Sequence, residues 1–137
     1  MTDPELLAKR LSVIETCVRE LRELARPEAI ATDVREARFV EHTLQLALQA
    51  ALDAASHIVS DERLGEPSTN RELFDRLERA GWIEAPLADA LRNMAGFRNI
   101  LVHGYDAVHL EIVRDVVEHR LDDLLRFADS VRQRLQT

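Results

Sequence analysis

The sequence predicts an all-α protein, an antiparallel bundle of four to five helices in a single domain that spans residues 1–137. Three observations predict this fold class. Apolar residues recur at alternating steps of three and four along most of the chain, strand-like alternation is absent, and the connections between the periodic segments are short. A length of 137 residues is typical of one domain, and no linker is long enough to divide the chain.

The first predicted helix has a clear start and a clear end. Thr2 or Asp3 can cap it, Pro4 suits its first turn, and Pro27 marks its end. Its apolar stripe is Leu7, Leu11, Ile14, Val18, Leu21 and Ala25, widened by Leu6, Val13, Cys17 and Leu24. Cys17 is therefore interpreted as a packing residue of the core rather than a nucleophile, and a lone cysteine cannot form a disulfide within the monomer.

A second helix is predicted from about Asp33 to Asp61. Its stripe is Val40, Leu44, Ala47, Ala51, Ala54 and Ile58, with Leu48, Leu52, Ala55 and Val59 alongside and Leu46 and Ala50 further round. Such a helix needs neighbours on more than one side, and its alanines permit close approach. We expect it to be the central helix and a candidate subunit interface.

Three further helices follow a loop at residues 63–68. Thr69 and Glu72 have the spacing of a capping box, which opens a short helix that ends near Gly81. Pro86 suits the first turn of a fourth helix. Asp106 can cap the last helix, whose stripe is Leu110, Val113, Val117, Leu121, Leu124, Ala128, Val131 and Leu135.

Composition excludes several classes of function. No segment has the roughly 20 apolar residues of a membrane span, and the polar start is no signal peptide, so a soluble, cytoplasmic protein is expected. The net charge is −7, which argues against broad attraction to nucleic-acid backbones. Seventeen arginines stand against one lysine, and arginine's planar fork suits carboxylates and phosphates.

One segment between two helical patterns gathers side chains that carry chemistry. Residues 97–105 read Phe-Arg-Asn-Ile-Leu-Val-His-Gly-Tyr, which brings together a cation, an amide, an imidazole and a phenol. If the helix continues to His103, then Asn99 and His103 share one face, whereas Arg98 lies about 140° from His103 around the axis. Arg98 and His103 could converge only at an irregular helix end, which Gly104 permits, or by approaching one pocket from two sides.

Residues 98–105 resemble the signature of HEPN domains, in which an arginine, usually followed by asparagine, precedes a histidine by a few residues. The tyrosine two residues after the histidine resembles the HepT-like toxin branch. The resemblance extends upstream to residues 50–58 and, in layout, to residues 70–97, and it covers nearly the whole chain.

The resemblance implies a HEPN-like homodimer whose two motifs face each other across a cleft, and metal-independent cleavage of RNA with no cofactor. His103 would act as general base or acid, because an imidazole titrates near neutrality. Arg98 would bind the scissile phosphate and stabilise its developing charge. Asn99 would orient the phosphate or the histidine.

The resemblance also implies a protein partner, a minimal nucleotidyltransferase antitoxin that transfers AMP from ATP to Tyr105. The added group would block the cleft and repel an RNA phosphate. Further assembly of the homodimer with the antitoxin is left open.

Several residues keep alternative interpretations. Arg98 and His103 could be a structural cation and a core histidine, and Tyr105 a packing residue. Asp53 and His57, four apart on the central helix, could pair at a subunit interface, act in catalysis, or support the site from behind the catalytic groups.

A metal site made by His103, Asp106 and His109 is disfavoured, because these residues straddle the predicted helix break and no further ligand is placed. The hypothesis of function is a HepT-like ribonuclease toxin. The alternative is a catalytically weak HEPN-type module that binds a nucleotide or a protein.

Overall fold

A computed structural model describes residues 2–103 and 107–137, with the backbone alone for residues 102, 103, 107 and 108. This part of the chain contains helices and no strand. The helices are α1 (Pro4–Leu24), the short 3-10 helix η1 (Pro27–Ala29), α2 (Val34–Asp61), α3 (Asn70–Arg79), α4 (Ala85–His103), α5 (Ala107–His119) and α6 (Leu121–Gln136). The predicted all-α class is confirmed.

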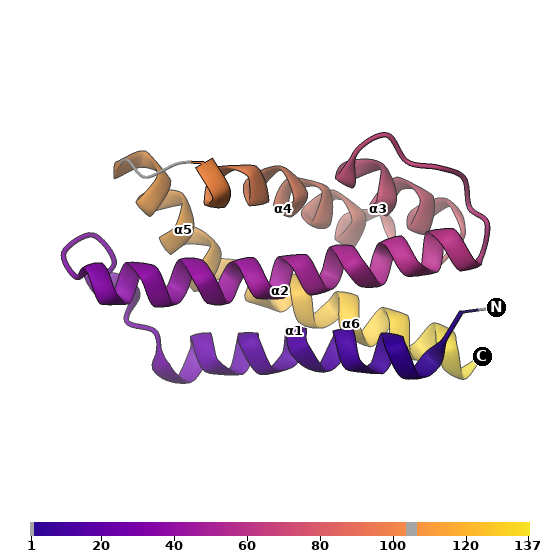
Figure 1. Cartoon of the computed structure of the whole chain (residues 1–137), viewed down its shortest axis with the longest axis horizontal. Helices are drawn as coiled ribbons and strands as arrows, with labels where there is room; N and C mark the ends of the chain where they lie inside the picture. Colours follow the sequence, from indigo (N-terminus) through magenta and orange to yellow (C-terminus); the bar gives the residue numbers. More distant parts are fainter. Residues whose placement is uncertain (1, 104–106) are drawn as a thin grey trace.

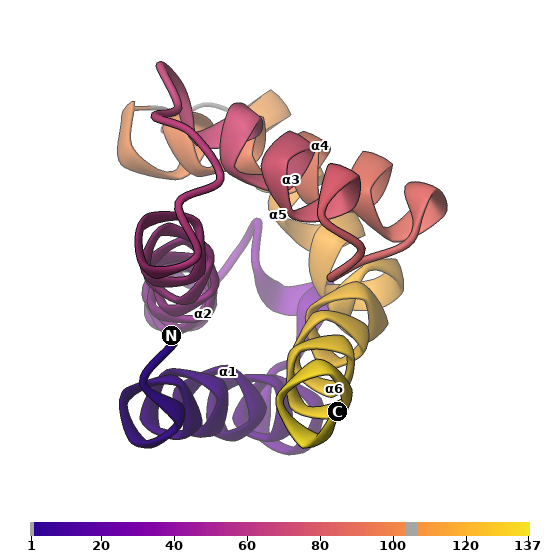
Figure 2. The same ribbon diagram turned by 90° about the vertical axis from the view of Figure 1, so that its right-hand side faces the viewer.

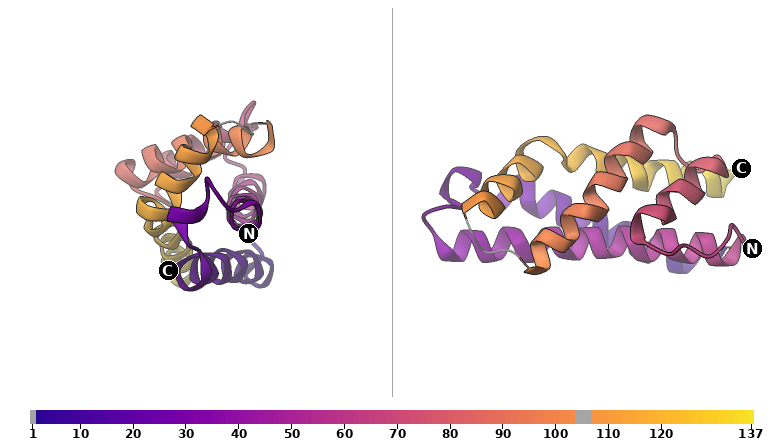
Figure 3. Two further views of the ribbon diagram at one scale, coloured as in Figure 1. Left: turned by 90° about the vertical axis from the view of Figure 1, so that its left-hand side faces the viewer. Right: turned by 90° about the horizontal axis from the view of Figure 1, so that it is seen from above.

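The long helices form an antiparallel bundle. α1 and α2 lie side by side in opposite directions, α4 runs opposite to α2, and α5 and α6 return along the molecule (Figure 1). Seen from one end, α2, α1 and α6 surround the core on three sides, and α3 and α4 close the fourth (Figure 2). α3 packs beside the first half of α4, above α2 (Figure 3).

The helix starts that the sequence predicts are formed by side-chain caps. The Asp3 carboxylate accepts hydrogen bonds from the backbone N–H groups of Glu5 and Leu6, so Asp3 rather than Thr2 caps α1. The Thr69 hydroxyl accepts from the N–H of Glu72 at 3.3 Å, as the capping box predicts. These bonds satisfy backbone donors that have no partner within the helix.

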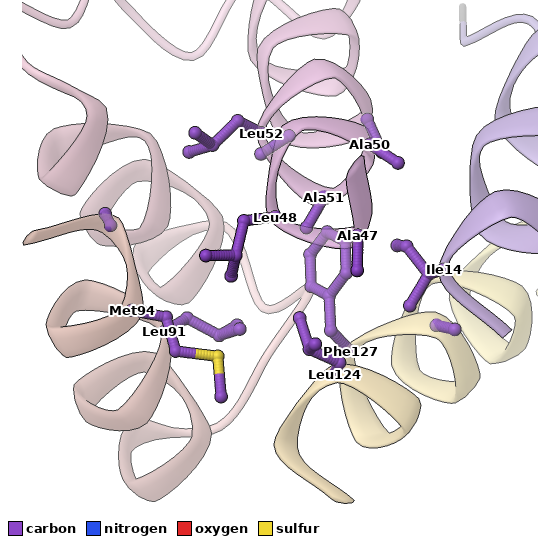
Figure 4. Packing of buried hydrophobic residues seen from close by; sticks show 14 of the residues in the cluster. Ile14, Ala47, Leu48, Ala50, Ala51, Leu52, Leu91, Met94, Leu124 and Phe127 are labelled. Carbon is purple, nitrogen blue, oxygen red and sulfur yellow. The ribbon is translucent and has the colours of Figure 1, made fainter. Parts of the chain in front are cut away.

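α2 is the central helix, as its sequence predicts. Leu48 points toward Leu91 and Met94 of α4, while Ala47 faces the ring of Phe127 on α6 (Figure 4). Small side chains on the α6 side of α2 and larger ones on the α4 side let both neighbours pack closely. The helix is therefore buried on several sides.

Three residues assigned to apolar stripes are exposed instead. Val13, Leu24 and Leu46 keep 38%, 60% and 46% of their surface accessible. They sit at the edges of their stripes, where periodicity alone does not decide burial. Cys17 is buried as predicted, and burial together with the nearby charge of Glu20 raises the pKa of its thiol.

The prediction of a single last helix is wrong, because this segment forms two helices. α5 ends at His119 and α6 begins at Leu121, with Arg120 between them at φ −121° and ψ 0°. The apolar stripe continues through the break and conceals it. The charges reveal it, since a basic end at His119 is followed by the acids Asp122 and Asp123 in the first turn of α6, as helix dipoles favour.

Ion pairs join the first helix to the last. Arg22 contacts Asp122, and Arg132 Nη2 lies 2.8 Å from Glu15 Oε1. The hydrogen bond from Arg22 lowers the pKa of the Asp122 carboxyl, and the hydrogen bond to Glu15 raises the pKa of Arg132. Separately, no helix in residues 2–103 or 107–137 combines the length and apolar character that crossing a membrane needs.

The aromatic centre of the core gives a stability prediction. Phe127 is fully buried, and its ring meets that of Phe74 edge-on at a centroid distance of 6.0 Å. We expect Phe127→Ala to lower the free energy of unfolding by about 3–5 kcal/mol, because it leaves a cavity and removes the ring contact. Urea denaturation measures this loss. The control Leu24→Ala, at an exposed site, should change stability by less than about 0.5 kcal/mol, and equal losses would contradict the packing described.

Candidate active site

Residues 98–103 of the motif lie on the last two turns of α4. The backbone of α4 is helical through His103, so positions 99 and 103 fall on the same side of the helix. Arg98 is half-buried and Asn99 is exposed. The side chain of His103, and Gly104, Tyr105 and the predicted cap Asp106, lie outside the described residues.

Arg98 reaches across to the central helix. Its Nε donates a hydrogen bond to Gln49 Oε1 of α2 at 3.1 Å. Gln49 Nε2 in turn donates to Asp53 Oδ1 at 2.8 Å. This relay joins the guanidinium to α2 through a neutral amide, and within the described residues both terminal nitrogens of Arg98 are left for other acceptors.

A second arginine on α4 shows how different this environment is. Arg92 Nη1 lies 2.8 Å from Asp75 and 3.1 Å from Glu78, and Arg92 also contacts Asp89. Burial alone would lower the pKa of Arg92, but hydrogen bonds to these carboxylates outweigh it and raise the pKa. In contrast, no carboxylate in the described part of the chain lies within 4.0 Å of the Arg98 guanidinium. Arg98 therefore keeps an uncompensated charge, which suits it to bind an anion.

Asp53 and His57 do not pair with each other. Asp53 accepts from Gln49, and His57 Nε2 lies 3.0 Å from Asp61 Oδ2, one turn further along α2. Asp53 thus reaches Arg98 through Gln49, whereas His57 contacts a carboxylate further along α2. Sequence reasoning missed Gln49, although its position four residues before Asp53 is a known helical pairing that could have indicated it.

His109 is held by the protein rather than presented as a free ligand. It is only 2% exposed, and its Nε2 lies 3.6 Å from Oε1 of the buried Glu41 on α2. This contact fastens the start of α5 to the central helix. Among residues 2–103 and 107–137 no group of three potential ligands could hold a metal ion, and the disfavoured combination with Asp106 falls partly outside that range.

A large pocket of the described residues lies elsewhere. A depression of about 730 Å³ at the other end of the bundle is lined by α6 and the α3–α4 connection, and Arg134 lies over the Trp82 ring there, 5.4 Å from its centroid. None of its lining residues belongs to the motif or to the Gln49 relay. The chemistry of the motif, rather than the volume of a pocket, therefore identifies the candidate site.

Comparison with known families now decides the family. The sequence profile described as ribonuclease HepT-like matches residues 14–131. The chain belongs to the HepT-like ribonuclease family.

Relatives agree over nearly the full length of this HepT-like chain. It is 31% identical over 129 residues to the mRNA nuclease HepT of Shewanella oneidensis, covering 93% of this chain and 97% of the relative. It is 34% identical over 111 residues to the tRNA nuclease HepT of Aphanizomenon flos-aquae, covering 77% and 74% of the two chains.

Solved structures agree with the HepT-like fold. A tri-AMPylated Shewanella oneidensis HEPN toxin in complex with MNT antitoxin superimposes with a TM-score of 0.86 at 31% identity, covering 97% of this chain and 99% of the other. A toxin–antitoxin structure with AMP-PNP gives 0.87 at 30% identity, with coverages of 94% and 98%. YutE of Bacillus subtilis also gives 0.87, over 98% and 92% of the two chains, but at 15% identity this likeness concerns the fold alone.

The relay predicts the effect of one added charge. In Gln49→Glu a carboxylate would take the amide's place beside Arg98, neutralise its charge and stand next to Asp53. We expect the Kd for a single-stranded RNA to rise by at least about tenfold, equivalent to about 1.4 kcal/mol, because the phosphate must then compete with an internal anion.

Fluorescence anisotropy measures this Kd, and thermal unfolding verifies that the fold is kept. Gln136→Glu adds the same charge at the last residue of α6, on the opposite end of the bundle, and should leave the Kd nearly unchanged. Equal effects of the two variants would show that only net charge matters.

Proposed function

We propose that this HepT-like protein is the ribonuclease toxin of a toxin–antitoxin pair. It cleaves RNA in the cytoplasm as a metal-independent homodimer and is inactivated by AMP transfer to Tyr105. The observation that carries the proposal is the environment of Arg98, a half-buried motif arginine held by a neutral amide in a chain of this ribonuclease family.

The chemistry follows from the types of side chain in the motif. His103 removes the proton of a ribose 2′-hydroxyl, and the resulting oxygen attacks the adjacent phosphorus. The 5′-oxygen of the next nucleotide leaves with a proton, so that the products are a 2′,3′-cyclic phosphate and a 5′-hydroxyl. Arg98 stabilises the extra negative charge on the phosphoryl oxygens in the transition state, and Asn99 orients the phosphate. Asp53 supports Arg98 through Gln49.

A homodimer supplies the second proton-transfer group. Each chain has one motif histidine, whereas the reaction needs a base and an acid. Two exposed apolar side chains flank the relay, Leu46 three residues before Gln49 and Ile100 two residues after Arg98. Burying them against a second copy would bring two motifs close together.

Inactivation by the antitoxin uses Tyr105 as a nucleophile. Its hydroxyl oxygen attacks the α-phosphorus of ATP, loses its proton, and displaces pyrophosphate, which leaves a tyrosyl-AMP two residues from His103. The solved relatives support this step, since one is a tri-AMPylated HEPN toxin with MNT antitoxin and another a toxin–antitoxin structure with AMP-PNP.

A catalytic test separates the proposal from its alternative, a catalytically weak module that binds a nucleotide or a protein. The purified protein should cleave RNA in excess chelator. His103→Ala should reduce the rate by about 10²–10⁴-fold because it removes the general base, and Arg98→Ala should reduce it comparably because it removes the phosphate-binding cation. Single-turnover rates on a labelled RNA measure both effects.

Size-exclusion chromatography with light scattering should show that both variants remain folded dimers. Cleavage that survives both substitutions would refute the catalytic assignment. RNA binding by the unmodified protein without any cleavage would favour the binding-module alternative.

The modification is tested by mass spectrometry. After coexpression with the nucleotidyltransferase, the peptide that contains Tyr105 should gain one or more AMP groups and the protein should lose ribonuclease activity. Tyr105→Phe should remain active under the same conditions, because it lacks the nucleophilic oxygen. An unmodified Tyr105 in a fully inhibited complex would contradict this mode of inactivation.

A further inference from the structure

An arginine of α3, Arg71, lies directly against α4 at Gly96, just before the motif segment. A Cβ atom at Gly96 would lie 2.5 Å from Arg71 Nη2 and 3.3 Å from its Cζ, which is closer than carbon tolerates. The absence of a side chain at position 96 therefore leaves the space that the guanidinium occupies. Gly96 is helical, so its role is to admit Arg71 rather than to supply an unusual backbone conformation.

The charge of Arg71 is available to a ligand. Its side chain is exposed, and no carboxylate of the described residues lies within 4.0 Å of its guanidinium. Arg92 of α4, by contrast, contacts the carboxylates of Asp75, Glu78 and Asp89. An exposed guanidinium that has no counter-ion among the described residues has terminal N–H donors for a phosphate.

The register of α4 places this cation on the side of the helix that carries position 103. Gly96 precedes His103 by seven residues, close to two full helical turns, so the two positions fall on the same side of α4 about 10 Å apart along its axis. The exposed residues Asn99 and Ile100 lie between them on that side. Arg71 thus stands at one end of a strip that leads to the general base.

We propose that Arg71, admitted by Gly96, forms a subsite for a phosphate of the RNA that flanks the scissile phosphate. Arg98 binds the phosphate that reacts, and Arg71 binds one further along the strand. Proteins that bind single strands follow the backbone with successive cations, and Arg71 of α3 together with Arg98 of α4 would define the direction in which the strand lies. This subsite rests on the proposed function for its ligand, but its test measures binding and does not require cleavage.

The experiment compares two arginines of α3 in the His103→Ala protein, which leaves the RNA intact. Arg71→Ala should raise the Kd of an oligoribonucleotide of eight or more residues about tenfold. The slope of log K against log salt should fall by about 0.7, the value for one lost phosphate contact on a single strand. Arg79→Ala removes an exposed charge from the last turn of the same helix and should change neither quantity.

RNA length gives a second comparison. A dinucleotide that contains only the scissile phosphate should bind equally to the Arg71→Ala and Arg79→Ala proteins, because it cannot reach the subsite. If the long RNA also binds equally to both, the subsite is refuted. If Arg71→Ala weakens binding of the antitoxin but not of RNA, this surface belongs to a protein contact and the proposal is again wrong.

Gly96→Ala tests whether the space beside Gly96 positions the Arg71 guanidinium. The added methyl group displaces the terminal nitrogen of Arg71 from its position, so the variant should lose part of the RNA affinity that Arg71→Ala loses, and the double variant should lose no more than Arg71→Ala alone. Additive losses would refute the coupling. Should Gly96→Ala unfold, Arg71→Lys tests the phosphate contact itself, because lysine keeps the charge without the fork and should keep only part of the affinity; full affinity in Arg71→Lys would contradict a contact made by the guanidinium fork.

An unmodified protein that binds RNA through Arg71 but does not cleave it would refute the ribonuclease mechanism and leave the subsite standing. If the protein cleaves RNA but Arg71→Ala changes neither its RNA affinity nor the salt dependence of binding, the subsite is refuted and the ribonuclease mechanism stands.

Discussion

The apolar surface of α2 must be covered from several sides, and this constraint determines where the site can form. α1 and α6 cover one part of the helix, and α3 and α4 cover another. The strip of α2 that carries Gln49 and Asp53 is only half-buried and lies beside α4. Because α4 is fixed by packing of residues such as Leu91 and Met94, Arg98 meets Gln49 at a defined distance. Packing of the core thus positions the polar relay, as rigid elements position most functional groups.

Periodicity and capping were sufficient to predict the helices up to α4, since Asp3, Pro4 and Thr69 are local signals that tertiary packing did not override. The break at Arg120 escaped prediction because an unbroken apolar stripe passes through it. The motif residues were identified by resemblance. The roles of Gln49 and Arg71 depend instead on contacts between helices, because Gln49 is 49 residues from Arg98 and Arg71 is 25 residues from Gly96. Such contacts require the crossing of α2, α3 and α4, which no local pattern specifies.

The distribution of arginine partners reconciles an acidic chain with an RNA substrate. Arg22, Arg92 and Arg132 face carboxylates and contribute little net field. Arg98 and Arg71 face an amide and a glycine. A net charge of −7 therefore confines attraction to a short stretch of surface instead of abolishing it. The same acidic background would discourage RNA from binding elsewhere on the molecule, which favours productive encounters over nonspecific ones.

The contact between His109 and Glu41 limits how far the segment that carries the proposed modification site can move, and this affects how long inhibition by AMP transfer would last. Leu101 of α4 and His109 of α5 are both buried, so the chain is anchored four residues before and four residues after Tyr105. A four-residue segment reaches at most about 14 Å, so chain length alone keeps the backbone at position 105 within that distance of both anchors, and the proposed modification would attach the nucleotide there. An inhibitory group attached through so short a segment has an effective concentration at the site in the millimolar range or above. Dilution, such as that during cell growth, would not relieve this inhibition. Only removal of the nucleotide or synthesis of new toxin would restore activity.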